Sequence, residues 1–393
     1  MNKQTIKDVN LKDKKIIMRA DFNVPLDDNL NITDDLRIQA ALPTIKYILE
    51  QSPAKLILMS HLGRPKGQAV DKMRLTPVAR KLQQVLGEDV LATSDCVGSE
   101  VADQVANAKE RVVLLENLRF HKEEEGNNPD FAKQLASLAD IYVNDAFGTA
   151  HRAHASTEGI TKYLPAVAGF LLEKEIAYLG KAIHNPERPF VVILGGAKVS
   201  DKILLIENLL TKADTIIISG GMAYTFLKAQ GQEIGKSLLE EDRIPVAREL
   251  LEKAKKAGVK IALTSDFLVV DDFDNQASKR YVDDIPAGTE SLDVGPKTIE
   301  QFKAILSEAK TVVWNGPLGV FEIDAYAEGT KAIAEHLATL KDTTTIIGGG
   351  DSAAAVKKFN VEAGMTHIST GGGASLELLE GKELPGIAAL QDK

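Results

Sequence analysis

The chain has 393 residues, more than one hydrophobic core normally supports, so two domains are expected. Its 44% hydrophobic and 26% charged residues are ordinary for a globular protein, and the net charge of −9 argues against a nucleic-acid partner. The chain has one cysteine, Cys96, and its charged N-terminus lacks a signal-peptide pattern. It contains no apolar run of membrane-spanning length. These features predict a cytoplasmic protein with no membrane partner.

Short apolar runs rich in Val and Ile alternate with helix-like segments along the whole chain. In the first half, the predicted strands are 15–18, 55–59, 111–115 and 140–143. In the second half, they are 190–194, 215–219, 260–263, 311–314, 343–347 and 367–369. Near-continuous apolar strands separated by helices are typical of parallel sheets covered on both faces. The pattern predicts an α/β fold with two Rossmann-like domains, each a parallel sheet covered by helices.

The boundary between the two halves is a predicted helix. Residues 169–183, GFLLEKEIAYLGKAI, have apolar positions at helical spacing, and Pro186 and Pro189 end the run. We expect domains at 1–170 and 185–382, joined by a hinge helix at 171–184. Relative motion is the expected behaviour across a modest interdomain interface. A single packed body without such motion is the alternative.

Polar and cationic residues follow the predicted strands of the first half, where ligands bind in open parallel sheets. They are Arg19, Asp21, Asn23, His61, Arg64, Asn117, Arg119, Asn144, Asp145, His151, Arg152 and His154, and Arg37 opens a helix nearby. Guanidinium groups suit phosphate and carboxylate oxygens, so the set predicts a small polyanionic ligand. Any one arginine could instead be a solvated residue or the partner of an acid. His151 and His154 could also suggest a metal site, but an arginine separates them and no cysteine is close in sequence.

The strands of the second half end in glycine. The turns are GGAK (195–198), GGM (220–222), NGPLG (315–319), GGGDS (348–352) and TGGGAS (370–375). Glycine lets the backbone approach a ligand closely, and the helices that follow offer N–H groups to phosphates. One such turn could be an ordinary β-to-α connection, but five on one sheet favour a nucleotide crevice.

A stretch that resembles a phosphate-binding P-loop lies elsewhere, at residues 229–237 (AQGQEIGKS). Only three residues separate its glycines, where the P-loop pattern requires four, and it follows a helix-like run instead of a buried strand. We therefore do not expect phosphate to bind there.

Lys198 and Lys202 are expected in the first turns of the helix that follows GGA. Cations at i and i+4 repel one another and oppose the helix dipole, and a bound phosphate chain would relieve both effects. Two solvated lysines are the alternative. Asp351, beside three glycines and Ser352, is a candidate carboxylate ligand for the Mg²⁺ that accompanies ATP.

Eight motifs spread along the chain together resemble those of the phosphoglycerate kinase family. They are MRADFNVPL, SHLGRP, ENLRF, AHRAHAS, LGGAKVSDK, WNGPLGVFE, GGGDSAAA and STGGGASLELLEG, in family order between about residues 5 and 390. The resemblance implies reversible phosphoryl transfer between 1,3-bisphosphoglycerate and ADP, giving 3-phosphoglycerate and ATP, in glycolysis. It also implies that the C-terminal tail, 383–393, packs on the first domain.

The resemblance implies a role for each matching residue. Phosphoglycerate would be bound by Asp21, Phe22, Asn23, Arg37, His61, Leu62, Gly63, Arg64, Arg119 and Arg152. The nucleotide would be bound by Lys202, Glu322, Gly349, Gly350, Asp351 and Ser352, with Asp351 on Mg²⁺. The catalytic residues that stabilise the transferred group would be Arg37, Lys198, Gly350 and Gly373. Ser352 stands where many members have Thr, which keeps the hydroxyl.

The residue inventory suits this chemistry. The attacking group is a substrate carboxylate that is already ionised at neutral pH, so no general base is needed. Phosphoryl transfer instead needs positioning and positive charge around the phosphoryl oxygens. We expect a monomer.

Two other functions remain open at this stage. Residues 348–353 satisfy G-x-G-x-x-A, the pattern of an NAD-dependent dehydrogenase, but no acidic residue closes the next strand and few residues follow. A hinged anion-binding protein without catalysis would explain the arginines, but not Lys198 and Lys202 beside the glycine turns.

Overall fold

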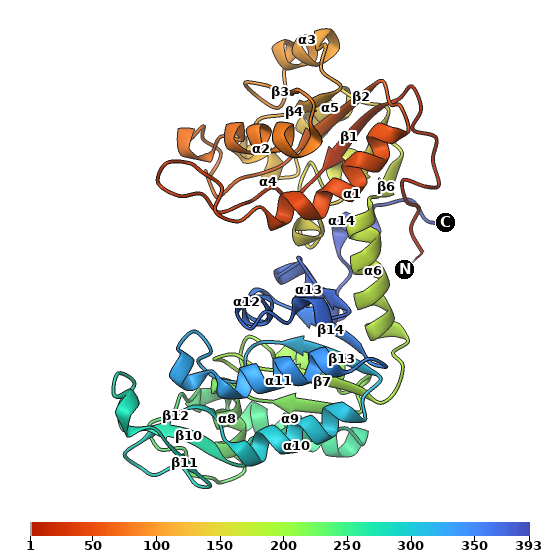
Figure 1. Cartoon of the computed structure of the whole chain (residues 1–393). Coiled ribbons are helices and arrows are strands. Elements are labelled where there is room, and N and C mark those ends of the chain that lie inside the picture. The colour runs from red at the N-terminus through yellow and green to blue at the C-terminus, as the bar shows by residue number, and fades with distance from the viewer. Residues whose placement is uncertain (1) are drawn as a thin grey trace. The chain divides into compact units, whose positions relative to one another are not determined.

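The structure, a computed structural model, describes residues 2–393. The chain divides into two compact units. The N-terminal unit contains the chain up to Ala177 together with Glu383–Lys393, and the C-terminal unit contains Tyr178–Lys382. The boundary falls inside helix α6 (Phe170–His184), so the helix predicted at 169–183 is confirmed (Figure 1).

All ten predicted strands are present, each within a residue or two of its expected bounds. In the N-terminal unit they are β1 (Lys15–Arg19), β2 (Lys55–Met59), β4 (Val112–Leu114) and β5 (Ile141–Asn144). In the C-terminal unit they are β7 (Phe190–Leu194), β8 (Thr215–Ile218), β9 (Lys260–Leu263), β13 (Thr311–Asn315), β14 (Thr344–Gly348) and β15 (His367–Ile368). The pattern missed β3 (Val90–Ala92), β6 (Ala166–Ala168), β10 (Phe267–Val270), β11 (Arg280–Val282) and β12 (Glu290–Val294).

The N-terminal unit is built on a parallel sheet with the strand order β3-β4-β2-β1-β5-β6 among the described residues. β1 is central, and Ile17 pairs with Ile57 on one side and Tyr142 on the other. β2, which follows β1 in the chain, pairs with one edge of β1, and β5 pairs with the opposite edge. The strand order therefore reverses between β1 and β5, which is where such sheets bind ligands.

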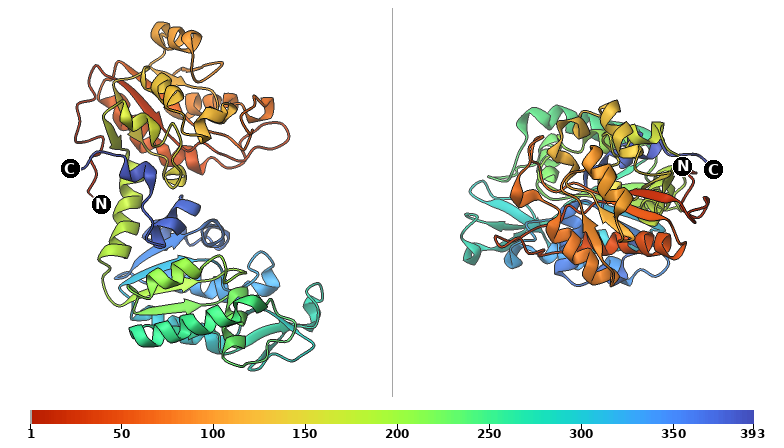
Figure 2. Two further views of the ribbon diagram at one scale, coloured as in Figure 1. Left: turned by 180° about the vertical axis from the view of Figure 1, so that it is seen from behind. Right: turned by 90° about the horizontal axis from the view of Figure 1, so that it is seen from above.

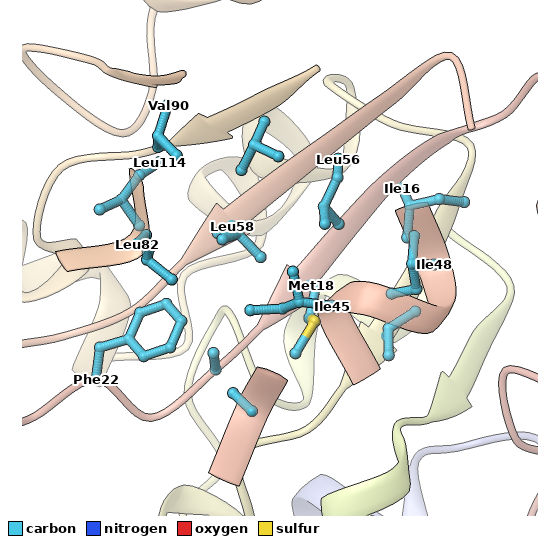
Figure 3. Close-up of a cluster of buried hydrophobic side chains, with 14 of the residues drawn as sticks. Ile16, Met18, Phe22, Ile45, Ile48, Leu56, Leu58, Leu82, Val90 and Leu114 are labelled. Atoms are coloured by element: carbon cyan, nitrogen blue, oxygen red, sulfur yellow. The ribbon is translucent and has the colours of Figure 1, made fainter. Parts of the chain in front are cut away.

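Helices cover both faces of this sheet. They are α1 (Leu36–Glu50), α2 (Thr76–Leu86), α3 (Ser99–Asn107), α4 (Lys122–Glu125) and α5 (Pro129–Ala136). Figure 3 shows Ile45 and Ile48 of α1 beside Ile16 and Met18 of β1, in a core that continues to Leu82 of α2. The strand residues whose side chains lie on the opposite face of the sheet, such as Ile17, Ile57 and Val113, are buried as well, as expected for a parallel sheet with two covered faces.

The C-terminal unit contains a second parallel sheet, with the order β15-β14-β13-β7-β8-β9 among the described residues. Its order reverses between β7 and β13. The core on one face joins Val191 and Trp314 to helices α10 (Pro296–Ser307) and α11 (Glu328–Thr339). Residues 203–257 supply the helices seen in front of the sheet in Figure 2, left. Beyond β9, strands β10, β11 and β12 form a small antiparallel sheet in the order β11-β10-β12.

The α-helices that lie wholly within the C-terminal unit are α7 (Ile203–Leu209), α8 (Gly221–Ala229), α9 (Ile244–Ala257), α10 (Pro296–Ser307), α11 (Glu328–Thr339), α12 (Gly350–Lys358) and α13 (Gly373–Leu379).

Short 3-10 helices occur in both units. In the N-terminal unit they are η1 (Asp71–Met73), η2 (Leu118–Phe120), η3 (Phe147–Thr149) and η4 (Gly159–Lys162). In the C-terminal unit they are η5 (Glu241–Arg243), η6 (Gln276–Ser278), η7 (Asp324–Tyr326) and η8 (Glu362–Gly364). Within residues 2–393, none of the helices combines the length and the apolarity that crossing a lipid bilayer requires.

The last residues of the chain lie with the N-terminal unit. Helix α14 (Pro385–Ala388) is fixed there because Asn144 Nδ2, at the end of β5, donates to Gly386 O at 2.9 Å. Farther along, Gln4 N donates to Gln391 O at 2.8 Å, so the two ends of the chain lie side by side (Figures 1 and 2).

Candidate active site

The carboxyl end of the N-terminal sheet gathers most of the residues predicted to bind a polyanion. Asp21, two residues after β1, forms an ion pair with Arg37 in the first turn of α1. Asn23 accepts a hydrogen bond from Gly63 N at 2.8 Å through Oδ1, which joins the loop after β1 to the loop after β2. Arg37 therefore opens its helix as predicted, and its guanidinium is turned to the strand-end loops.

Arg119 reaches the same loops from η2, after β4. Its side chain is buried, and Nη1 donates to Gly63 O at 3.0 Å while Nε lies 3.3 Å from the Glu125 carboxylate. Leu62 O accepts a hydrogen bond from Asn117 Nδ2 at 2.8 Å. The loops after β1, β2 and β4 are thus fastened to one another by backbone and side-chain bonds.

Arg64 differs from these residues, because its side chain is exposed and has no hydrogen bond or ion pair with residues 2–393. Arg152, in the loop after β5, is half-buried, and its Nε lies 3.1 Å from His151 Nε2. Both guanidinium groups therefore keep donors that an anionic ligand can use.

The cationic groups lie close enough to affect one another's protonation. Burial, followed by the charges of Arg19, Arg119 and Arg37, holds the pKa of His61 well below its ordinary value. Burial and the Arg19 charge likewise lower the pKa of His154 to about 3. Both imidazoles are neutral at physiological pH, and the positive charge of this end of the sheet comes from the arginines.

The carboxyl end of the C-terminal sheet is built from glycine turns packed on one another. A Cβ atom added to Gly195, after β7, would lie 2.0 Å from Pro317 O. Gly316, after β13, has a φ of +101°, and its added Cβ would lie 2.3 Å from Gly195 O. These two glycines are required by the contact between the turns themselves, which the interpretation of the glycines as ligand-facing did not foresee. Gly350 is different: nothing lies within 4 Å of its added Cβ, so the start of α12 is open.

Lys198 and Lys202 precede a helix instead of opening one. α7 begins at Ile203, so both lysines lie in the turn after β7, and the predicted repulsion within a helix does not arise. Between the two lysines, Ser200 is bonded to another part of the unit: its N and Oγ both donate to the Glu240 carboxylate, at 3.1 and 2.5 Å. Lys198 is exposed, whereas Lys202 is half-buried and donates through Nζ to Asn315 Oδ1 at the end of β13.

Two of the residues assigned to the nucleotide, Asp351 and Ser352, lie near Lys202 and Asn315. Burial lowers the pKa of Lys202, and the nearby charges of Asp201, Glu380 and Asp351 oppose that shift. Asp351 is exposed in the first turn of α12, whose first N–H groups point away from the helix. Ser352 is buried, and its Oγ accepts from Gly316 N at 2.6 Å. The Ser352 hydroxyl therefore holds the turn after β13.

Comparison with known proteins gives the family. A family model described as phosphoglycerate kinase matches residues 6–382. The chain belongs to the phosphoglycerate kinase family.

Relatives support the assignment over the full length. A phosphoglycerate kinase of Moorella thermoacetica is 58% identical over 396 residues, covering 100% of both proteins. The solved phosphoglycerate kinase of Coxiella burnetii is 42% identical with a TM-score of 0.90, and that of Pyrococcus horikoshii OT3 is 33% identical with a TM-score of 0.81. Each covers 98% of both chains. As a member of the phosphoglycerate kinase family, the chain is a glycolytic phosphotransferase whose acceptor is the carboxyl group of phosphoglycerate.

Membership in the phosphoglycerate kinase family excludes the dehydrogenase and the non-catalytic binding protein. The rejected P-loop stretch has a structural role, since Gly235 packs against Thr289 O and Ser237 Oγ accepts from Ser291 N at 2.9 Å. It supports the edge of the small antiparallel sheet.

Asn315 and Arg19 are parts of the candidate site to which the resemblance to the family gave no ligand or catalytic role. Asn315 was quoted only as part of a glycine turn, although a polar residue at the end of a buried strand is a usable signal. Arg19 was named at a strand end, but nothing in the sequence indicates that it is completely buried.

Proposed function

We propose that the N-terminal unit binds phosphoglycerate and that the C-terminal unit binds the nucleotide. The division of charges carries the proposal. Arg37 and Arg119 lie beside His61 at the carboxyl end of the first sheet, and Lys202 and Asp351 lie at the carboxyl end of the second, the edge at which such sheets bind ligands. Residues 1–170 with 383–393 then form the phosphoglycerate domain, residues 185–382 the nucleotide domain, and 171–184 the helix between them.

The phosphoglycerate ligands in this proposal are Asp21, Phe22, Asn23, Arg37, His61, Leu62, Gly63, Arg64, Arg119 and Arg152. Buried arginine and imidazole donors fixed by neighbouring loops suit a ligand with a carboxylate and a phosphate. Asp21 holds Arg37 in place by their ion pair.

The nucleotide ligands are Lys202, Glu322, Gly349, Gly350, Asp351 and Ser352. The open start of α12 offers backbone N–H groups to phosphate, and Lys202 supplies a cation beside it. Asp351 fits Mg²⁺, because one exposed carboxylate leaves room for the phosphate and water oxygens that this ion prefers. Magnesium bound there would offset the charge of the phosphate oxygens.

Transfer itself requires the phosphoryl group to be surrounded by donors. Arg37 from one unit, and Lys198, Gly350 and Gly373 from the other, would stabilise its oxygens as it moves between the substrate carboxylate and ADP. The carboxylate needs no base to become a nucleophile. We also propose that the enzyme works as a cytoplasmic monomer, since its assigned ligands all come from one chain and its family acts in glycolysis.

A direct assay tests the activity. The protein is incubated with MgATP and 3-phosphoglycerate in the presence of hydroxylamine, which traps an acyl phosphate as a hydroxamate. Hydroxamate should form only when both substrates are present and should not require a nicotinamide cofactor. Absence of the acyl phosphate under these conditions would overturn the proposed function.

Arg64→Ala tests the division between the two units. The exposed guanidinium has no partner among residues 2–393, so its loss should leave the fold intact and remove one charged hydrogen bond to phosphoglycerate. The KM for 3-phosphoglycerate should rise about tenfold or more, with little change in the affinity for ADP. Arg119→Ala should raise it further, because Gly63 O also loses its donor.

Arg80→Ala is the matched control, since Arg80 is an exposed arginine on α2 in the same unit. Its kinetic constants should match the wild type. Equal losses of affinity for both ligands in Arg64→Ala, measured by titration calorimetry, would show that the assignment to two separate sites is wrong.

A further inference from the structure

A buried chain of hydrogen bonds joins two charges behind the proposed phosphoglycerate site. Arg19, the last residue of β1, donates through Nε to Ser156 Oγ at 2.9 Å. Ser156 Oγ donates in turn to Glu124 Oε1 of α4 at 2.5 Å. Arg19, Ser156 and Glu124 are each fully buried. One hydroxyl group therefore connects a buried guanidinium to a buried carboxylate.

Ser156 is held in place for this role mainly by Glu124. Its backbone N donates to Glu124 Oε2 at 3.0 Å, so the carboxylate grips both the hydroxyl and the amide. The amide of the preceding residue, Ala155 N, donates to the backbone oxygen Glu124 O at 2.9 Å. The Tyr142 hydroxyl donates to Ser156 O at 2.8 Å. Burial raises the pKa of Glu124, and the charge of Arg19 and the two hydrogen bonds from Ser156 oppose that shift by favouring the carboxylate.

The guanidinium group of Arg19 also contacts His61. Its Nη1 donates to Ala20 O, and its Nη2 lies 3.1 Å from His61 Nδ1. A guanidinium has donors only, so Nδ1 accepts the bond and cannot carry a proton. Because burial and the surrounding arginines keep the pKa of His61 low, its single proton lies on Nε2. His61 is thus a neutral imidazole with its Nε2–H available to a ligand.

We infer that Glu124 is a positioning residue for phosphoglycerate binding: through Ser156 and Arg19 it holds His61 in the Nε2–H tautomer that donates to an anionic oxygen of the substrate. The inference rests on the proposed phosphoglycerate site. Without the link, the Arg19 guanidinium could rotate about its bonds, and neutral His61 would distribute its proton over both ring nitrogens. The carboxylate also balances one of the positive charges that crowd this end of the sheet.

Two variants break the link at different points. Ser156→Ala removes the hydroxyl and leaves both charges in place. Glu124→Gln replaces an oxygen by an NH₂ group, which must then face either the Ser156 amide or the Ser156 hydroxyl; one existing hydrogen bond is lost in either orientation. Ser156→Ala should therefore have the full effect on His61, and Glu124→Gln should shift His61 in the same direction, because it removes the carboxylate charge and one of the two bonds that hold Ser156.

The first measurement is the ¹⁵N spectrum of the histidine side chains in the free protein. Wild-type His61 should show an unprotonated Nδ1 and a protonated Nε2, and both variants should show signals shifted towards an exchanging mixture of tautomers. The second measurement is kinetic. The KM for 3-phosphoglycerate should rise about tenfold, as expected for one charged hydrogen bond, while kcat and the KM for ATP stay close to wild type.

Tyr142→Phe is the control for loss of stability. It removes the hydrogen bond to Ser156 O and leaves the link between Glu124, Ser156 and Arg19 intact. This variant should unfold at a lower temperature but keep the wild-type His61 tautomer and KM.

His61→Ala, which removes both the acceptor that faces Arg19 and the donor that faces the substrate, separates the inference from the function on which it rests. If this variant binds 3-phosphoglycerate normally, the proposed phosphoglycerate site is wrong. If it raises the KM while Ser156→Ala and Glu124→Gln keep the wild-type tautomer and KM, the site stands and the positioning role of Glu124 is overturned.

Discussion

Lys198 and Lys202 are four residues apart in the same turn but have different surroundings. Lys202 is half-buried and bonded to Asn315, so its ammonium is already placed before any ligand arrives. Lys198 is exposed and has no partner among residues 2–393, so its ammonium is free to follow a moving phosphoryl group. The geometry therefore suits Lys202 to binding the nucleotide and Lys198 to stabilising the transition state.

Lys198→Ala should lower kcat about tenfold or more and change the KM for 3-phosphoglycerate little, because an interaction made only in the transition state contributes nothing to ground-state binding. Steady-state kinetics with both substrates measure the split. Lys236→Ala, in the rejected P-loop stretch of the same unit, is the control and should be indistinguishable from wild type in kcat and in the KM for ATP. Wild-type turnover in Lys198→Ala would remove Lys198 from the catalytic group.

The positions of the site residues were predictable from the sequence, but their burial was not. Apolar periodicity locates the ends of the strands, and the rule that ligands bind there selects His61, Arg64 and Arg119 without a structure. The same reasoning treats Arg19 and Arg64 alike, although one is fully buried and the other exposed. The difference depends on Ser156, 137 positions along the chain from Arg19, and no local pattern reports such a contact.

At the scale of elements, the start of α6 is fastened to the end of β5 by one carboxylate. Asp145 Oδ1 accepts from Leu171 N at 2.9 Å and from Leu172 N at 3.2 Å, which satisfies two of the amides left free at a helix start. The Asp145 amide donates to Arg19 O at 2.9 Å. The first turn of the helix proposed as the hinge is thus capped by Asp145, whose backbone is bonded directly to the strand that carries Arg19.

The fastening should depend on pH. Burial raises the pKa of Asp145 to about 7, above its ordinary value of 3.8, so the folded state binds a proton that the unfolded state releases. Such a group stabilises the fold fully below pH 3.8, and its contribution decreases as the pH rises towards 7. Although the bonds from amides 171 and 172 favour the ionised carboxylate, burial outweighs them, so the protection of these amides against exchange through unfolding of the N-terminal unit should fall from pH 5 to pH 8 in the wild type, by about tenfold or more.

Asp145→Asn should make that protection nearly independent of pH, because the amide keeps an acceptor and does not titrate. Asp293→Asn is the matched control: burial also raises the pKa of Asp293 to about 7, but this residue caps α11 through Gly329 N in the C-terminal unit. It should leave the α6 profile unchanged. An equal pH dependence in wild type and Asp145→Asn would show that Asp145 does not control the start of this helix.

Three of the five strands that were not predicted, β3, β6 and β11, share a physical reason. β3 and β6 have three residues each, too few for a periodic signal, and each is held by pairing with one neighbour on its sheet. β11 is largely exposed, so its pairing with β10 decides its conformation more than burial does. Strands this short are specified by partners distant in sequence, whereas the central strands of each sheet are apolar enough to be recognised alone.

At the scale of the whole molecule, the proposed chemistry sets a requirement on the two units. Arg37 belongs to one unit and Lys198 and Gly373 to the other, and all three are assigned to a single phosphoryl group. They must come within hydrogen-bond distance of it at the moment of transfer. The substrates must also enter and leave, and water must be kept from the phosphoryl group. Closure that depends on both ligands meets all three demands.

Small-angle X-ray scattering measures this closure directly. The radius of gyration should fall most in the ternary complex with MgATP and 3-phosphoglycerate, because only then does each unit present its ligand to the other. Either ligand alone should give a smaller decrease, since half of the phosphoryl contacts would be missing. Arg37→Ala should weaken closure in the ternary complex and leave the free form unchanged, as it removes the contact that the N-terminal unit contributes. Arg80→Ala should close as the wild type does. Identical scattering from the free, singly bound and ternary forms of an enzyme that turns over normally would rule out closure as the means by which these residues meet.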